Sequence, residues 1–139
     1  MIRITLTDDV AACHLIRRRV FIEEQNVSEA DELDELDPVA LHLLAADETG
    51  ALGTARLLIE GETGKIGRVA VLREARGQGV GHALMREALA VLRARPGVKK
   101  AKLGAQIHAL GFYEALGFTA YGPEYDDAGI PHRDMELML

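Results

Sequence analysis

The residues best suited to chemistry lie in a glycine-rich hexapeptide, Arg76-Gly77-Gln78-Gly79-Val80-Gly81. It follows an apolar run at 67–72 and precedes an amphipathic segment that begins at His82, so a strand is expected to lead through a turn into a helix. Glycines leave few side chains in the way, and backbone N–H groups at a helix start attract anions, here with help from Arg76. The hexapeptide therefore predicts a cradle for a phosphate or pyrophosphate.

Two other phosphate-binding motifs do not fit this stretch. A P-loop ends in Gly-Lys-Ser or Gly-Lys-Thr, and neither occurs here. A dinucleotide fingerprint needs its third glycine where this chain has His82, and an acidic residue about 20 positions further on, where Pro96 and Lys99 offer none. The remaining alternative is that the glycines only form a tight turn.

Two motifs resemble those of the GNAT superfamily of N-acetyltransferases. Arg-x-x-Gly-x-Gly after Val69-Ala70-Val71 is similar to its coenzyme A pyrophosphate loop, and 106–118 resembles its Asn-x-x-Ala-x-x-Phe-Tyr-x-x-x-Gly-Phe helix, with Gln106 at the Asn position. The resemblance implies that acetyl-CoA is bound by 69–71, the hexapeptide and Gln106. An N–H group of 69–71 would bind the oxyanion, and Tyr113 would protonate the departing thiolate.

Further segments, 17–25, 34–37, 40–42 and 127–132, are similar to the ElaA-like (YjcF-like) subgroup of that superfamily. The subgroup pattern contains three candidates for the general base, Glu24, His42 and His132, and a water chain is a fourth. Glu24 ranks first among them. These segments do not identify the acceptor.

Composition limits the classes of function. With 139 residues the chain forms one domain, 1–139, and its formal charge of −6 argues against nucleic acid as a partner. No apolar run is long enough to cross a membrane, and Asp8 and Asp9 interrupt any signal peptide, so a cytoplasmic protein is expected. Cys13 is the only cysteine, and the five histidines lack the spacing of a zinc site, so no metal is expected.

Six acidic residues crowd the segment 29–37. Such a run is usually a solvated face, and the alternative is a rim that attracts an amine.

Apolar periodicity predicts the order of the elements. Strands are expected at 2–6, 40–46, 51–59, 66–72, 98–105, 118–121 and 133–139, with helices at 8–25, after the glycine loop, and at 107–116. Thr7 or Asp8 is expected to cap the first helix. This α/β order also looks like the GNAT fold, in which three α/β/α layers surround one mixed, mostly antiparallel central sheet that is splayed at the coenzyme cleft.

The resulting hypothesis is an N-acetyltransferase that moves the acetyl group of acetyl-CoA directly to a primary amine of a small molecule or peptide. An acyl-CoA-binding sensor without transferase activity is the alternative, and a homodimer is left open.

Overall fold

The computed structural model describes residues 1–139 and contains one seven-stranded sheet in the order β1-β2-β3-β4-β5-β7-β6. Neighbouring strands are antiparallel except for β4 and β5, so the predicted mixed, mostly antiparallel sheet is confirmed. The strands are β1 (Arg3–Thr7), β2 (Leu41–Asp47), β3 (Gly50–Glu60), β4 (Thr63–Val71), β5 (Lys100–Gln106), β6 (Thr119–Asp127) and β7 (Ile130–Met138).

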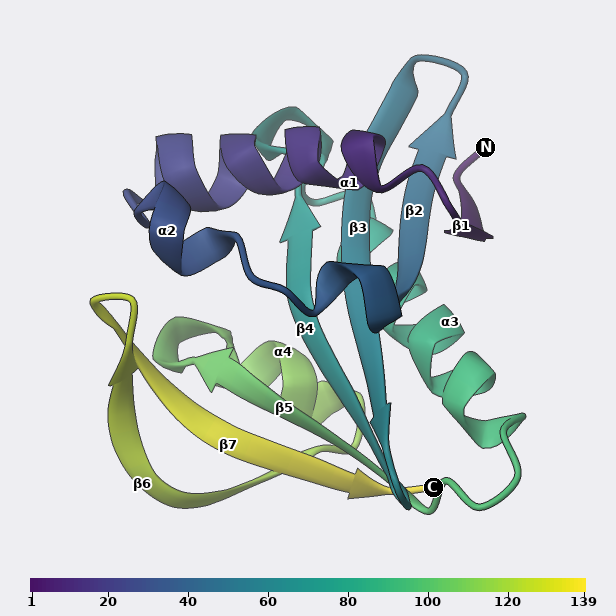
Figure 1. Ribbon diagram of the computed structural model, residues 1–139, viewed down its shortest axis with the longest axis vertical. Helices are drawn as coiled ribbons and strands as arrows, with labels where there is room; N and C mark the ends of the chain where they lie inside the picture. The colour runs from purple at the N-terminus through teal and green to yellow at the C-terminus, as the bar shows by residue number, and fades with distance from the viewer.

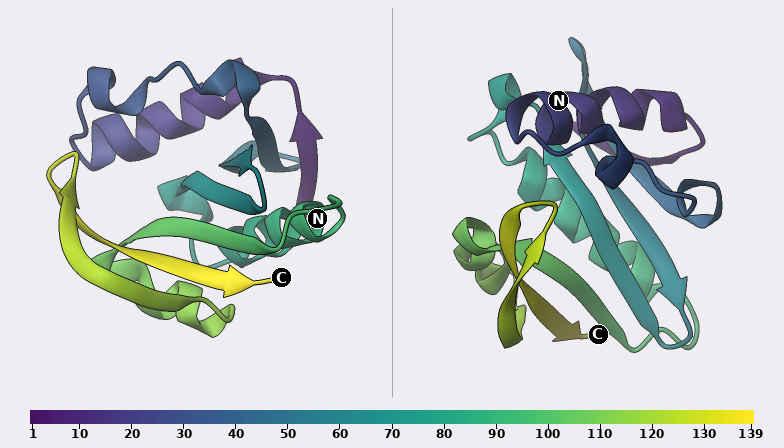
Figure 2. Two further views of the ribbon diagram at one scale, coloured as in Figure 1. Left: turned by 60° about the horizontal axis from the view of Figure 1, so that its bottom comes forward. Right: turned by 60° about the vertical axis from the view of Figure 1, so that its left-hand side comes forward.

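Helices cover both faces of the sheet, which confirms the three-layer arrangement (Figures 1 and 2). One face carries α1 (Val10–Arg17), its continuation as the π-helix η1 (Arg18–Glu24), and the short α2 (Glu29–Glu32). The other carries α3 (Val80–Arg93) and α4 (Leu110–Ala115). Three 3-10 turns complete the chain, at Asp37–Val39, Arg73–Ala75 and Ile107–Ala109.

The core extends over both faces of the sheet, with Ile16 and Val20 on the side of α1 and a larger group on the apolar side of α3. Burying one Leu side chain contributes about 1.5–3 kcal/mol, so this side holds the helix firmly against the sheet. Spacings of three and four residues put the apolar side chains on that side: Val80, Leu84, Met85, Ala88, Leu89 and Leu92 are buried.

The sheet separates into two halves between β4 and β5. These strands pair only at Thr63–Lys65 with Lys100–Lys102, and beyond that point they diverge (Figure 1). A register shift against β3 puts a bulge in β4 at Arg68, whose φ of 49° is left-handed. β5 pairs with β7 instead over Lys100–Gln106, so the divergence opens a cleft without leaving β5 unpaired.

Three details differ from the sequence-based expectation. The first helix is capped by Asp9, whose carboxylate accepts the N–H of Ala12 at 3.1 Å, and it changes to π-helical pairing at Arg18. The last two strands are longer than predicted, because a bulge between Tyr121 and Tyr125 absorbs residues 122–124 without ending β6. The hairpin β6–β7 therefore reaches further toward the cleft. No helix has the length and apolar character needed to span a membrane.

Candidate active site

A cavity of about 790 Å³ occupies the cleft between β4 and β5. Its wall is formed by both strands, the end of η1, the start of α4 and the hairpin β6–β7. Seven of the residues predicted for the site lie in this wall: Glu24, Val69, Ala70, Val71, Arg76, Gln106 and Tyr113. Residues far apart in the sequence therefore meet at one cavity.

The glycine loop lies beyond Arg76, where β4 passes into α3. Gly77 and Gly79 have φ values of 77° and 82°, and no atom lies within 4 Å of the position that a Cβ would take on either. No side chain caps α3, so the N–H groups of its first turn have no side-chain acceptor. This open helix start suits an anion, although residues 77–81 lie beside the cavity wall and not in it.

Packing of α4 against the start of α3 brings the two motifs together. A Cβ on Gly81 would lie 3.4 Å from Cζ of Phe112 on α4. This contact sets the helix that carries Tyr113 against the helix that follows the glycine loop.

Arg76 is held by two groups at the cleft. Its two terminal nitrogens donate to the carboxylate of Glu24 at 2.5 and 2.8 Å, and its Nε donates to the carbonyl of Val71 at 3.1 Å. The hydrogen bonds from Arg76 lower the pKa of Glu24, and they raise the pKa of Arg76. A carboxylate with a lowered pKa is a weaker proton acceptor, so this ion pair argues against Glu24 as the base.

The backbone of Val71 faces the cleft. Leu72 donates its N–H to the carbonyl of Leu52 in β3 at 2.9 Å. Successive residues of a strand direct their N–H groups to opposite sides, so the N–H of Val71 points away from β3, toward the open side of β4. The carbonyl of Val71 points to the same side, where it accepts from Arg76. Among residues 69–71, Val71 therefore has the best-placed donor for an oxyanion.

Tyr113 lies in apolar surroundings. Its ring meets Phe112 edge to face at a centroid distance of 5.0 Å and Phe118 at 6.2 Å. Burial raises the pKa of Tyr113 to about 12. The hydroxyl is therefore protonated at neutral pH and available as a donor.

Gln106 is bonded across the cleft. Its Nε2 donates to Oε1 of Gln25, the residue that ends η1, at 2.9 Å, and its Oε1 accepts from Nε2 of His108 at 2.7 Å. Two groups expected to bind the coenzyme, Arg76 and Gln106, are thus bonded to consecutive residues, Glu24 and Gln25.

The two histidine candidates for the base differ in position. His132 on β7 is 8% exposed and lines the cavity, and its Nδ1 donates to the carbonyl of Ile130 at 2.7 Å. That bond leaves Nε2 as the acceptor of the neutral ring, and no protein group bonds to it. His42 is buried away from the cavity wall, with Nε2 bonded to the carbonyl of Asp37 at 2.9 Å.

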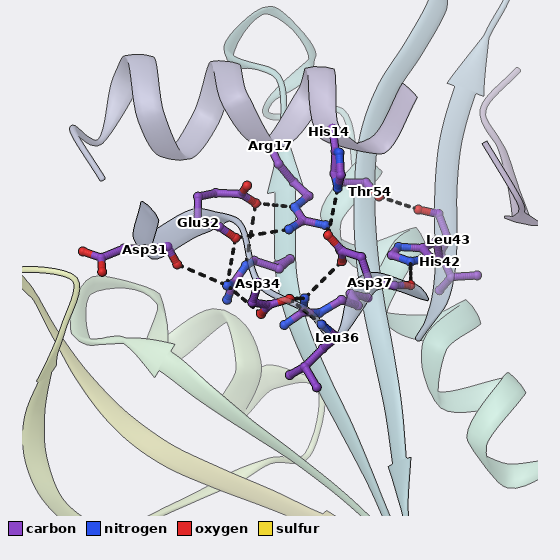
Figure 3. A network of polar contacts seen from close by, with 12 residues as sticks. His14, Arg17, Asp31, Glu32, Asp34, Leu36, Asp37, His42, Leu43 and Thr54 are labelled. Atoms are coloured by element: carbon purple, nitrogen blue, oxygen red, sulfur yellow. Dashed lines mark hydrogen bonds and ion pairs between the residues drawn. The ribbon is translucent and has the colours of Figure 1, made fainter. Parts of the chain in front are cut away.

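The acidic run is only in part a solvated face, because four of its six acidic residues are exposed and two are buried. Glu32 and Asp37 are buried, and they form an ion network with Arg17, which bonds to both carboxylates (Figure 3). Arg56 joins through Asp34 at 2.8 Å and Asp37 at 3.1 Å. Residue spacing does not reveal this burial, because the arginines that pair with the run come from α1, β3 and β4.

The network also reaches the bulge in β4. Arg68 donates to the carbonyl of Glu32 at 3.1 Å and to the carboxylate of Asp34 at 3.3 Å. The carboxylate of Asp31 projects away from these groups in Figure 3, although its backbone carbonyl accepts from Arg68 at 3.4 Å, and Asp31 lines the cavity. One member of the run thus fits the predicted rim.

Comparisons with known proteins agree with this geometry. The sequence model of the acetyltransferase (GNAT) domain family matches residues 8–139. The chain is 40% identical to the uncharacterized protein YyaT of Bacillus subtilis over 133 residues, which is 94% of this chain and 89% of YyaT. An acyl-CoA N-acyltransferase of Pseudomonas aeruginosa superposes with a TM-score of 0.88 at 32% identity, covering 98% of this chain and 99% of that one. Escherichia coli ElaA superposes with a TM-score of 0.86 at 30% identity and the same coverage. The chain therefore belongs to the GNAT acetyltransferase family, a family of acyl-CoA-dependent N-acyltransferases, and within it is similar to ElaA.

Proposed function

We propose that this enzyme transfers the acetyl group of acetyl-CoA directly to a primary amine of a small molecule or peptide, with both substrates bound at once. The observation that carries the proposal is the single cavity between β4 and β5. Arg76, Tyr113 and His132 all line this cavity, although they come from three different segments of the chain. A thioester and an amine can thus meet within one open cavity.

His132 is the proposed general base. An alkyl amine with a pKa near 10.4 must lose a proton before it attacks, which costs about 4.6 kcal/mol at neutral pH. His132 lines the cavity and its Nε2 has no protein partner, whereas Glu24 is paired with Arg76. A free imidazole nitrogen accepts a proton in the physiological pH range, so His132 is better suited than the first-ranked Glu24.

Val71 and Tyr113 stabilise the two negative charges that develop on the substrate in the transition state. Attack on the thioester builds an oxyanion, and one oriented N–H donor such as that of Val71 is worth roughly 3 kcal/mol. The sulfur then leaves as a thiolate, to which the Tyr113 hydroxyl donates a proton. The glycine loop would hold the pyrophosphate through its backbone, with Gln106 bonding to the remainder of the coenzyme.

Unpaired charge on the acceptor side favours a cationic molecule. Asp31 of α2 and Asp127 at the hairpin turn both line the cavity, and neither carboxylate has an ion-pair partner. The other carboxylates of the wall, Glu24 and Glu32, are neutralised by arginine. Opposite charge at a cleft mouth raises the local concentration of an ammonium ion.

Release of free thiol from acetyl-CoA in the presence of a panel of amines tests the proposal, with coenzyme affinity measured separately by calorimetry. We expect His132→Gln to lower kcat about 100-fold and to leave the Kd of acetyl-CoA within about twofold, because the base does not contact the coenzyme. Binding of acetyl-CoA without thiol release to any amine would support the sensor instead. Absence of binding would refute both.

A further inference from the structure

In the hairpin β6–β7, the ring of Tyr125 stacks against the ring of His132, the proposed base. Tyr125 of β6 is paired in register with His132 of β7, and their rings stack with centroids 5.9 Å apart and planes 24° apart. The Tyr125 hydroxyl donates to Oδ1 of Asp134 at 2.7 Å, two residues beyond His132 on the same face of β7. The phenol is therefore fixed at both its ring and its hydroxyl.

A glycine in β5 provides the space for this phenol. Gly104 lies opposite Asp134 in the β5–β7 ladder, and a Cβ added to it would overlap with the Tyr125 hydroxyl. Gly104 has no left-handed backbone angle that would demand glycine. Space for the phenol is thus the feature of the structure that calls for glycine at this position.

We propose that Tyr125 is a positioning residue for His132, acting through its stacked ring, for which Gly104 leaves the space. Its ring face limits rotation of the imidazole, so that Nδ1–H stays bonded to the carbonyl of Ile130 and Nε2 stays directed into the cavity. The catalytic part of this inference rests on the proposed function, in which His132 accepts the proton of the amine. The orientation itself can be measured without substrate.

Three variants separate the elements of this arrangement. Tyr125→Leu removes the stacked ring, and Gly104→Ala displaces the phenol without changing Tyr125. Tyr125→Phe keeps the ring and loses only the bond to Asp134. Gly67→Ala is the stability control, because it adds a methyl group to a strand glycine with no atom within 4 Å of the new carbon.

The first measurement is the tautomer of His132, read from long-range ¹H–¹⁵N correlations of the imidazole nitrogens and assigned with His132→Gln. In the wild type we expect the Nδ1–H form. Tyr125→Leu and Gly104→Ala should give a mixture of tautomers, whereas Tyr125→Phe should keep the wild-type pattern. Unchanged signals in both disruptive variants, each with a melting temperature like that of Gly67→Ala, would overturn the inference.

The second measurement is steady-state kinetics. Tyr125→Leu and Gly104→Ala should each lower kcat about tenfold and leave both KM values within about twofold, since an aromatic pair of this kind is worth up to about tenfold in an equilibrium. The double variant should lose no more than either single variant, because both remove the same contact. A rise in KM for the amine with kcat and tautomer unchanged would make Tyr125 a wall of the acceptor site and overturn the positioning role.

The two measurements also keep this inference separate from the proposed function. A wild type without transferase activity, but with a tautomer that shifts in the variants, would refute the catalytic function and support the positioning of the ring. If Tyr125→Leu fails to fold, Gly104→Ala carries both measurements by itself.

Discussion

At the scale of single residues, the proposed acid and base are held by different physical means. Tyr113 lies among aromatic rings and has its pKa raised by burial, to about 12, with no charged group involved. His132 is oriented by hydrogen bonding and stacking. The phenol is thus a donor at every physiological pH, and the free thiolate that it protonates, with a pKa near 8.5, is a weaker base than the phenolate. Complete transfer of the phenol proton to the thiolate is therefore unfavourable by itself, and the Tyr113 hydroxyl stabilises the departing sulfur first as a hydrogen-bond donor.

Tyr113→Phe tests this assignment, since it removes the hydroxyl and keeps the ring contacts with Phe112 and Phe118. We expect kcat to fall about 100-fold, with the Kd of acetyl-CoA within about twofold and little change in melting temperature. A raised pKa keeps the group protonated to higher pH, so the wild-type enzyme should show no decline in kcat caused by this phenol below about pH 10. A variant that lost only coenzyme affinity would show that Tyr113 has a binding role.

Local motifs explain which site residues could be predicted from the sequence. Arg76, Gln106 and Tyr113 belong to two short motifs, and both motifs reach the cavity. The partner of Arg76, Glu24, lies 52 residues away, and spacing alone does not reveal such a pair. Tyr125 lies outside the predicted strand at 118–121, because a bulge between Tyr121 and Tyr125 continues β6 beyond it.

At the scale of elements, apolar periodicity predicted the order of strands and helices, but it could not predict the separation of β4 and β5 that forms the cleft. Pattern identifies β4 and β5 as strands, but their separation depends on a bulge at Arg68 and on the pairing of β5 with β7. Both depend on contacts between distant segments. The join of β4 to α3 is local, and its glycines were correctly placed at a turn into a helix.

Gly79→Val tests the start of α3 as an anion site. A β-branched residue in the left-handed region costs roughly 1–2 kcal/mol and puts a side chain into the open mouth, so we expect acetyl-CoA affinity to fall at least about tenfold. Gly97→Val is a matched control, because Gly97 has a φ of 86°, no atom within 4 Å of the Cβ position, and a place beyond the other end of α3. Calorimetry should show weak binding for the first variant and wild-type binding for the second. Equal affinity in both would contradict the loop assignment.

At the scale of the whole molecule, the buried ion network joins α1, the acidic segment, β3 and β4 (Figure 3). Nε of Arg56 and Nε of Arg68 are buried without hydrogen-bond partners, so the network is incompletely satisfied. Buried ion pairs of this kind often add little net stability over apolar packing. The structural consequence of the network is that the bulge of β4 and the acidic segment 29–37 are held in one arrangement.

Asp37 gives the network a predictable response to acid. Burial by itself would raise its pKa, but hydrogen bonds from Arg17, His14 and Arg56 outweigh burial and hold the pKa of Asp37 well below its ordinary value. A carboxyl whose pKa is lower in the folded state stabilises the fold above its unfolded pKa of about 3.9, and this contribution is lost as the pH falls below that value. The free energy of unfolding of the wild type should therefore decline as the pH drops below about 5.

Asp37→Asn should remove part of that decline and lower the free energy of unfolding at pH 7 by about 1–3 kcal/mol, since it removes one of the two carboxylates that Arg17 and Arg56 each contact. Urea denaturation of both proteins between pH 7 and pH 3 measures the two effects together. Glu35→Gln is the control, because Glu35 is exposed in the same acidic run and has no ion-pair partner, and surface changes are usually within about 0.5 kcal/mol. If Asp37→Asn were as stable as Glu35→Gln at pH 7, the network would not be what holds the acidic segment against the sheet.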